Sequence, residues 1–294
     1  MKSFWQRWED RMLKIEKNKM GFSCEVFPPK RNDDIYEIYR TLDELKLIKP
    51  DFISVTYGAG GSNSKKTATI AAYIQNICEV EAIAHMTAVG MDENLLTSLL
   101  FELKKKGIDN VLALRGDKPK LMSDEEFESR KYKYAKDLIP EIRSRGDFFV
   151  AAACYPEVHP ESSNREEDIR YLKEKVDMGA DCLITQMFFD NKVFYEFLDD
   201  IKKAGIDVPV LAGIMPVTTA KQLGTSVQLS GSSVPNELSQ IIAKYGDNAD
   251  DMKKAGIEYA VTQINDLKKN GVDGVHLYTM NKADVTMAIH EAVI

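Results

Sequence analysis

Two acidic residues follow short apolar runs at positions where a carboxylate could take part in a reaction. Glu25 lies near the end of GFSCEVF, which Pro28 and Pro29 interrupt, and Asp117 follows VLALRG. A carboxylate in an apolar run must be paired, neutralised or used. If both carboxyl groups share one pocket, burial can leave one protonated as an acid and the other ionised as a stabiliser. Taken alone, Glu25 is as readily interpreted as a paired structural carboxylate.

Further polar side chains end the other apolar runs. They are Thr56 and Tyr57, His85 and Thr87, Arg115, Tyr155, Glu157 and His159, Thr185 and Gln186, and His276 and Tyr278. Some have structural interpretations too, with His85 as a hydrogen-bonded core histidine and Arg115 as a salt-bridge partner of Asp117. The segment GAGGSN (58–63) lacks the GxGxxG spacing of a dinucleotide fingerprint, so we expect a mobile loop there.

Eight runs of apolar or β-branched residues predict strands, and most are continuously apolar. They span residues 22–27, 51–57, 81–87, 109–115, 147–155, 181–186, 208–213 and 273–278. Strands buried on both faces have this composition, as in a parallel sheet covered by helices. Segments between them have helical periodicity, for example 33–48, 93–107, 165–180 and 191–205. The alternation predicts an α/β fold, a closed (β/α)8 TIM barrel, with a doubly wound sheet as the alternative.

The barrel prediction gives the polar residues one location, because chemistry in such barrels lies at the C-terminal ends of the strands.

Three helices should end at glycines in KGIDN, AGIDV and NGVDG. The interval 214–272 can hold one or two helices beyond the one that follows the seventh strand. We expect one domain over 1–294, with an extra helix over 1–19 and the barrel over 20–294. The apolar face of the extra helix, which carries both tryptophans, would pack on the barrel or on another subunit.

The composition limits the classes of partner. The chain has 294 residues and a net charge of −7, so nucleic acid and anionic membranes are poor partners. No apolar run approaches the roughly 18 residues of a membrane span, and the N-terminus is too charged for a secretory signal. The four cysteines form no CxxC pair, which predicts buried free thiols in a reducing cytoplasm and no metal site.

Eight short motifs carry a family resemblance. In chain order they are CEVFPPK, SVTYGAGGS, AHMT, ALRGD, YPEVHPES, ITQMFFD, GIMPV and HLYTMNKA. Together they resemble the bacterial methylenetetrahydrofolate reductase family over nearly the whole chain. The resemblance implies a (β/α)8 flavoprotein that holds FAD and reduces 5,10-methylenetetrahydrofolate to 5-methyltetrahydrofolate. It also implies that NADH, NADPH or an electron-donating partner protein reduces the flavin, and that the protein forms homo- or hetero-oligomers.

The resemblance also assigns roles to residues. Glu25 would protonate N10 as the folate ring opens, which desolvation of a carboxyl favours. Asp117 would stabilise the resulting cation, and Gln186 would bind the pterin, since an amide both donates and accepts. Further substrate contacts would be Gln222, Tyr278 and Lys282. Flavin contacts would be Thr56, His85, Leu114, Arg115, Gly116, Asp117, Tyr155, His159, Asp168 and Lys175, with Arg115 and Lys175 at the pyrophosphate.

Two departures from the family pattern keep the electron donor open. Ser226 stands where enteric relatives carry a stacking phenylalanine, and Glu174 replaces a basic flavin-side residue of some relatives. Two alternatives also remain. One is a pterin-binding barrel without flavin, either methyltransferase-like or a flavin-free reductase, which would need Gln186 and Asp117 but not Tyr155. The other is a non-catalytic subunit that binds folate or a partner.

Overall fold

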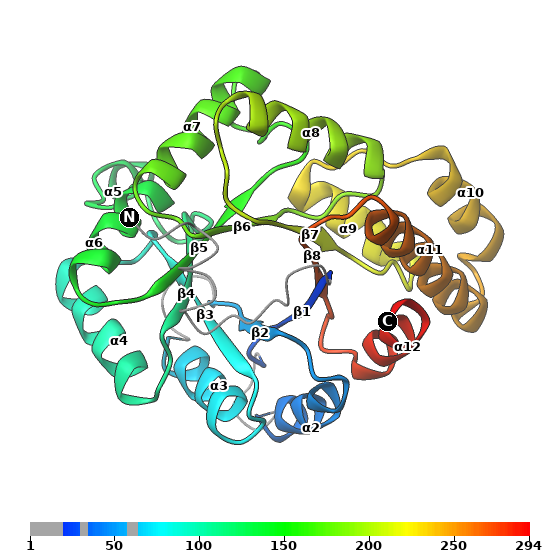
Figure 1. Cartoon of the computed structure of the whole chain (residues 1–294), viewed down its shortest axis with the longest axis horizontal. Coiled ribbons are helices and arrows are strands. Elements are labelled where there is room, and N and C mark those ends of the chain that lie inside the picture. Colours follow the sequence, from blue (N-terminus) through cyan, green and yellow to red (C-terminus); the bar gives the residue numbers. More distant parts are fainter. Residues whose placement is uncertain (1–19, 30–34, 58–63) are drawn as a thin grey trace.

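The computed structural model describes residues 20–29, 35–57 and 64–294. The expectations of an extra helix over 1–19 and of a mobile loop over 58–63 therefore lie outside the described residues. The strands are β1 (Gly21–Val26), β2 (Phe52–Val55), β3 (Glu81–Thr87), β4 (Asn110–Leu114), β5 (Phe149–Cys154), β6 (Cys182–Thr185), β7 (Val210–Ile214) and β8 (Gly274–Tyr278). Each pairs in parallel with the next, and β8 closes on β1 (Figure 1). The (β/α)8 prediction is confirmed, and the doubly wound alternative is wrong.

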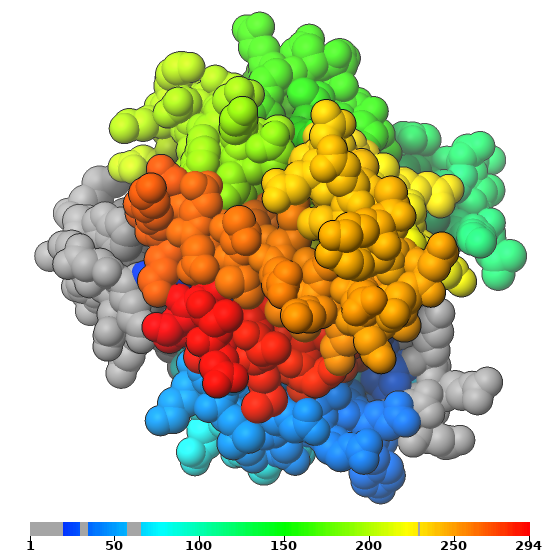
Figure 2. All heavy atoms as spheres, turned by 90° about the vertical axis from the view of Figure 1, so that its right-hand side faces the viewer, coloured from blue at the N-terminus to red at the C-terminus, as the bar shows by residue number. Residues whose placement is uncertain are grey.

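Helices surround the barrel in the order that the alternation predicts. They are α2 (Ile35–Leu45) with the short 3-10 helix η1 (Lys46–Ile48), α3 (Ser64–Asn76), α4 (Glu93–Lys105), α5 (Asp124–Glu128), α6 (Ala135–Ser144), α7 (Arg165–Asp177), α8 (Asn191–Lys203), α9 (Ala220–Ser230), α10 (Asn236–Tyr245), α11 (Ala249–Lys269) and α12 (Ala283–Val293). The long interval after β7 holds α9, α10 and α11, as expected. Figure 2 shows α10 and α11 side by side on the outside of the barrel, with α12 next to them. No helix in the described part of the chain is both long enough and apolar enough to cross a membrane.

The alternation of side chains along each strand separates two apolar layers. On β1, Cys24 and Val26 point outward and pack with the helices in the large core cluster. A second cluster fills the barrel interior, and its residues are Phe52, Ile83, Leu112, Phe149, Ala151, Cys182, Ile184 and Leu211. Successive residues of a strand face opposite sides, so Ser23 and Glu25 point inward on β1. The inward positions nearest the C-terminal mouth are therefore available for polar groups.

Glycines end three of the helices, as predicted. Gly107, Gly205 and Gly271 have φ angles of 76°, 73° and 69°, which favour glycine. In each case the N–H groups of the glycine and of the residue after it donate to carbonyl groups in the last turn of the helix. At the end of α4, for example, Gly107 N donates to Lys104 O and Ile108 N donates to Leu103 O. This pattern is the Schellman motif. It turns the chain directly into the following strand.

Aspartates at the starts of three strands fix the register with their neighbours. Asp51 accepts a hydrogen bond from Phe22 N at 2.6 Å, and Asp273 accepts one from Val210 N at 2.9 Å. Asp181 accepts from Val150 N at 2.8 Å and also pairs with Arg143. Each carboxylate satisfies a backbone donor where the strand ladder begins. The N-terminal end of the barrel is thus structural, which leaves the other end for chemistry.

The four cysteines confirm the prediction of buried free thiols. Cys24, Cys78, Cys154 and Cys182 are all buried and none forms a disulfide. Burial raises the pKa of each thiol above its ordinary value. Because the thiolate is the reactive form, these cysteines behave as small apolar residues of the core.

Candidate functional site

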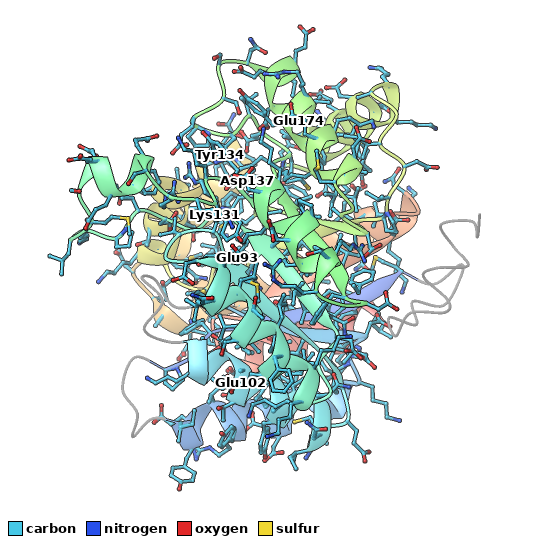
Figure 3. All side chains as sticks on the ribbon, turned by 90° about the vertical axis from the view of Figure 1, so that its left-hand side faces the viewer. Glu93, Glu102, Lys131, Tyr134, Asp137 and Glu174 are labelled. Carbon is cyan, nitrogen blue, oxygen red and sulfur yellow. The ribbon has the colours of Figure 1, made fainter. Side chains whose placement is uncertain are left out.

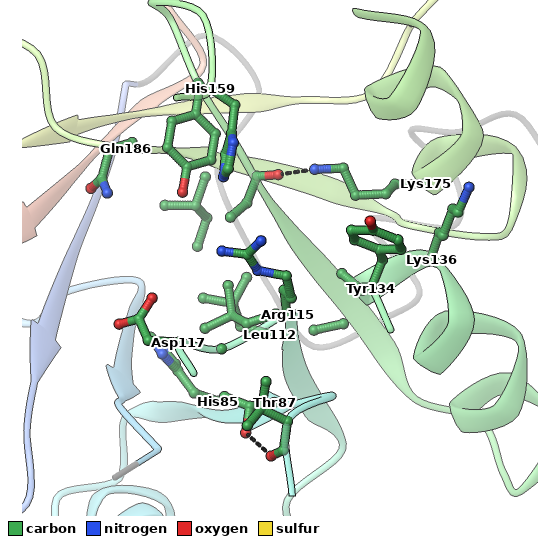
Figure 4. A pocket seen from close by; sticks show the side chains of 18 of the residues that line it. His85, Thr87, Leu112, Arg115, Asp117, Tyr134, Lys136, His159, Lys175 and Gln186 are labelled. Atoms are coloured by element: carbon green, nitrogen blue, oxygen red, sulfur yellow. Dashed lines mark hydrogen bonds between the residues drawn. The ribbon is translucent and has the colours of Figure 1, made fainter. Parts of the chain in front are cut away.

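A cavity of about 680 Å³ opens at the C-terminal mouth of the barrel (Figure 4). Its volume lies in the range of cofactor and ligand pockets. The structure brings most of the predicted site residues together here, namely Glu25, Thr56, His85, Leu114, Arg115, Gly116, Asp117, Tyr155, His159, Asp168, Lys175, Gln186 and Tyr278. These residues come from β1 to β6, β8 and α7, or from the loops between them.

Glu25 lies at the inner wall of this cavity, between two histidines. Its side chain is 20% exposed, and Oε2 lies 3.5 Å from His85 Nε2 and 3.9 Å from His276 Nε2. Burial lowers the pKa of His85 to about 4, although the Glu25 charge opposes this, so His85 is neutral at pH 7. His85 Nε2 has no hydrogen-bond partner among the described residues. The interpretation of His85 as a satisfied core histidine therefore does not hold at this nitrogen, which is buried beside the Glu25 carboxyl group.

The loop after β4 depends on a glycine. Gly116 has φ 81°, and a Cβ there would lie 2.8 Å from Thr87 Cβ. The close approach lets Ala88 N and Val89 N bond to Leu114 O and Arg115 O at 2.9 Å each. The loop presents Arg115 to the cavity and leaves Asp117 exposed at its rim. Arg115 forms an ion pair with Glu161, which replaces the salt bridge to Asp117 that we considered from the sequence.

The loop after β5 is folded by Asp168 from the first turn of α7. This carboxylate accepts hydrogen bonds from His159 N at 3.2 Å and from Ser162 Oγ at 3.1 Å. The His159 ring lies edge-on to Tyr155, with 4.5 Å between ring centres, and its Nδ1 accepts from Glu161 N. Burial and the nearby Arg115 charge lower the pKa of His159. Asp168 thus shapes the cavity wall that Tyr155 and His159 form.

Basic side chains gather on the α6–α7 side of the cavity. Lys175 donates to Ala153 O at 2.5 Å, and burial lowers the pKa of its amine (Figure 4). Lys136 of α6 pairs with Glu174 of α7 at 2.6 Å. Its amine lies 5.9 Å from the Tyr134 ring centre and 5.5 Å from that of Tyr171, both of which also line the cavity. Figure 3 shows Glu174 above Tyr134 on this side of the barrel. With Arg115, these cations can hold an anionic group of a cofactor.

Tyr134, Lys136, Glu161 and Tyr171 were not predicted to belong to the site. They lie on helices or in a long loop, whereas the residues singled out without the resemblance all stand at or just after strand ends. The resemblance added Asp168 and Lys175 of α7 but none of these four. The one available signal was the position of Tyr134 and Lys136 at the start of an amphipathic segment, where backbone N–H groups and a basic side chain can meet an anion.

Gln186 and Tyr278 occupy the opposite side of the cavity. Gln186 Oε1 accepts from Met187 N at 3.1 Å, and Figure 4 shows the amide pointing inward. Tyr278 reaches across β7, so that its hydroxyl donates to Thr185 O on β6 at 2.6 Å. A Cβ on Gly213 would lie 2.9 Å from the Tyr278 ring and 2.2 Å from Thr185 O. Gly213 therefore provides the space that Tyr278 fills.

Several residues singled out from the sequence do not line the cavity, namely Gln222, Lys282, Ser226, Glu174, Glu157, Thr185 and His276. Gln222 of α9 accepts from Thr218 N at 3.1 Å and donates to Pro216 O at 2.9 Å, and Lys282 donates to Thr218 Oγ1 at 2.8 Å. Ser226 is buried on α9. Their predicted relations to folate and to a nicotinamide therefore stay predictions.

A closed parallel barrel with carboxylates, an amide and cations around a cavity at its C-terminal mouth defines a TIM-barrel enzyme. Residues 11–293 match the family described as methylenetetrahydrofolate reductase. The chain belongs to the methylenetetrahydrofolate reductase family, which confirms the resemblance seen in the motifs and makes it an oxidoreductase.

Relatives of two kinds support this assignment. The chain is 34% identical over 271 residues to the Escherichia coli 5,10-methylenetetrahydrofolate reductase, covering 92% of this chain and 90% of that protein. It is 35% identical over 277 residues to an Arabidopsis thaliana methylenetetrahydrofolate reductase (NADH), covering 90% of this chain and 47% of the plant protein. The chain thus spans about half the length of the plant relative and nearly all of the bacterial one.

Solved structures show the same fold at low identity. A Clostridium thermocellum protein that binds two copies of 5-methyl-5,6,7,8-tetrahydrofolic acid has a TM-score of 0.65 and 15% identity, covering 94% of this chain and 95% of its own. A tryptophan synthase chain from M. tuberculosis has a TM-score of 0.53 and 12% identity, covering 94% of each chain. At this identity the likeness concerns the barrel alone.

Proposed function

We propose that this protein reduces 5,10-methylenetetrahydrofolate to 5-methyltetrahydrofolate and holds FAD as its cofactor. The observation that carries the proposal is the meeting of Glu25, Asp117 and Gln186 in one cavity with two cations, Arg115 and Lys175. Family membership supplies the reaction class, and the cavity supplies groups of the required chemistry.

The residues present fit a flavin dinucleotide. Arg115 and Lys175 are the charges that a pyrophosphate needs. Tyr155 offers an aromatic ring to a flat ring system, and His85 contributes a polar side chain to the cavity lining. Gly116 brings backbone close to the cavity, where a side chain would collide with Thr87. A pterin-binding barrel without flavin would have no use for this basic and aromatic half of the cavity.

The substrate half of the cavity supports acid catalysis. Glu25 is held by its strand at the cavity wall, where a protonated carboxyl can deliver a proton to N10 of the folate and open its five-membered ring. The opened ring carries an iminium cation, which the Asp117 carboxylate stabilises electrostatically. Gln186 orients the pterin through donor and acceptor contacts. A bound reduced flavin supplies the hydride that completes the methyl group.

The electron donor is NADH, NADPH or a partner protein. Ser226, buried on α9, provides no aromatic surface for a nicotinamide to stack on. A reducing cytoplasm agrees with the four free thiols. Anaerobic mixing of the oxidised protein with NADH and NADPH in separate experiments distinguishes the donors, since bleaching by neither nucleotide indicates a protein donor.

The proposal is tested by flavin content and by the Glu25→Gln variant. The purified protein should be yellow, or should bind added FAD with quenching of flavin fluorescence. Glu25→Gln should still accept electrons into the flavin, from dithionite if not from a nucleotide, but should lose roughly 100-fold or more of the rate of folate reduction, the scale of general acid catalysis. A colourless protein that cannot be reconstituted would refute the flavin assignment. Equal loss in both half-reactions would show that Glu25 is not the acid.

A further inference from the structure

A second layer of polar side chains lies directly below Glu25 in the barrel. Ser23, Ser54 and His276 point inward and are 1%, 0% and 0% exposed. Ser23 is the direct β-partner of His276, and Ser54 is the direct partner of Glu25. Buried polar groups cost stability unless they are hydrogen-bonded. Three such groups clustered below Glu25 therefore call for a functional explanation.

Both ring nitrogens of His276 contact a serine hydroxyl, so the direction of each hydrogen bond depends on the tautomer of the ring. Ser23 Oγ lies 2.8 Å from Nδ1 and donates to Val275 O at 3.1 Å. A serine hydroxyl has a single proton, and a carbonyl oxygen can only accept. With its proton on Val275 O, Ser23 presents a lone pair to Nδ1, and this arrangement requires Nδ1 to be the protonated nitrogen. Nε2 is then an acceptor, to which Ser54 Oγ donates at 3.2 Å.

The Nε2 atom of His276 faces the candidate acid. His276 Nε2 lies 3.9 Å from Glu25 Oε2, while His85 Nε2 lies 3.5 Å from the same oxygen on the other side. Tyr278, the β8 partner of Glu25, directs its hydroxyl away to Thr185 O. Among the other charged groups of the cavity, Asp117 is exposed at its rim, and the buried Lys175 amine is bound to Ala153 O on β5.

We propose that Ser23 is a positioning residue that holds His276 as the Nδ1–H tautomer, so that an acceptor faces Glu25 and orients its carboxyl proton. The role given to Glu25 rests on the proposed reductase function, whereas the tautomer does not. The opposite tautomer would direct an N–H toward Glu25 and favour the ionised carboxylate, which cannot act as an acid. Ser54 competes with Glu25 for the same lone pair, so the two serines have opposite effects on it.

The two serines therefore form a matched pair of variants. Ser23→Ala removes the acceptor from Nδ1–H, so the ring should change to the Nε2–H tautomer, which can still donate to Ser54. Ser54→Ala removes the donor to Nε2 and should leave the Nδ1–H tautomer in place. Both changes remove one buried oxygen from neighbouring strands, so a general loss of packing affects them alike.

Nitrogen-15 NMR of histidine-labelled protein reads the tautomer directly, because protonated and unprotonated ring nitrogens resonate apart. The chain has only four histidines, and a His276→Asn sample assigns the signal. We expect Nδ1–H in the wild type and in Ser54→Ala, and Nε2–H in Ser23→Ala. Nε2–H in the wild type, or an unchanged tautomer in Ser23→Ala, would overturn the assignment.

Half-reaction kinetics then test the positioning role. Ser23→Ala should slow folate reduction by the reduced flavin roughly tenfold, a fraction of what the acid itself contributes. Reduction of the flavin should be unaffected, and Ser23→Thr, which restores a hydroxyl, should recover the rate. Equal rates in Ser23→Ala and wild type, with the tautomer changed, would refute the role. If no variant reduces folate at all, the proposed function fails while the NMR result stands on its own.

Discussion

Gly213 offers a sharp test of how the barrel makes room for its site. A Cβ at this position would lie 2.2 Å from Thr185 O and 2.9 Å from both Cε2 and Oη of Tyr278. The first contact is with backbone, which cannot move without separating β6 from β7. Gly213 N of β7 also donates a hydrogen bond to Thr185 Oγ1 of β6 at 2.8 Å, so the threonine side chain takes the place of a backbone acceptor between these two strands. Gly213→Ala must therefore displace Tyr278, strain the strand pair, or both.

The expected destabilisation follows from these contacts. Overpacking a filled interior costs about 1–3 kcal/mol. Loss of the Tyr278–Thr185 hydrogen bond adds about 1 kcal/mol. We therefore expect the free energy of unfolding to fall by roughly 2–4 kcal/mol, and the melting temperature of a chain of this size to fall by about 5–15 °C.

Gly224 provides the control. It lies within α9 and a Cβ there would meet nothing within 4 Å, so Gly224→Ala should stabilise the helix by about 0.5–1 kcal/mol. Urea unfolding followed by circular dichroism compares the two variants. A Gly213→Ala protein as stable as wild type would refute the reasoning.

Three further predictions concern the mouth of the barrel. The Asn281 side chain accepts a hydrogen bond from Phe27 N at 3.0 Å and donates one to Phe27 O at 2.9 Å, and its backbone has φ 56°. Asn281→Ala should therefore lower the free energy of unfolding, measured in urea, by about 1–3 kcal/mol. Asn281→Gly should lower it less, because glycine tolerates the backbone angle. Glu161→Gln should remove the ion-pair partner of Arg115 and tighten FAD binding by up to about fivefold, as measured by fluorescence titration. Asp124→Asn removes the acid of another surface ion pair and should leave FAD affinity unchanged, so it is the control. For His85, the folded pKa of about 4 lies below the ordinary 6.5. The unfolded chain therefore takes up the proton first, and the apoprotein should lose about 2 kcal/mol of stability between pH 7 and pH 5. His85→Gln should flatten that part of the pH profile; an unchanged slope would contradict the assignment.

The strands and the ring of site residues were predictable for the same reason. Strands buried on both faces appear in the sequence as continuous apolar runs, and a closed barrel places their C-terminal ends together. Glu25, His85 and Gln186 were found because each ends such a run, whatever the details of the helices. The glycine helix ends were predictable too, since a left-handed residue is a local requirement.

Other parts of the site depend on distances that no local pattern contains. Arg115 has an acid two residues away, Asp117, yet pairs with Glu161 from a loop 46 positions along the chain. Lys136 reaches the cavity only because α6 packs beside α7, where Glu174 binds it. Side chains on helices enter a barrel mouth according to helix tilt and loop path, and neither follows from periodicity.

The layer below Glu25 shows what a prediction from strand ends leaves open, because His276 was among the polar residues found there but its partner Ser23 was not. Ser23 and His276 each stand two residues before a predicted site residue, Glu25 and Tyr278, and so face the same interior one level deeper. Their meeting requires the register in which Ser23 opposes His276, and the closure of β8 on β1. The alternation of side chains along a strand places Ser23 and His276 in the barrel interior, where polar groups without hydrogen-bond partners would destabilise the fold. Only the register turns them into a hydrogen-bonded pair that stands beside the carboxyl group, with His276 Nε2 3.9 Å from Glu25 Oε2. The tautomer of His276 is the property by which we propose that this pair acts on Glu25.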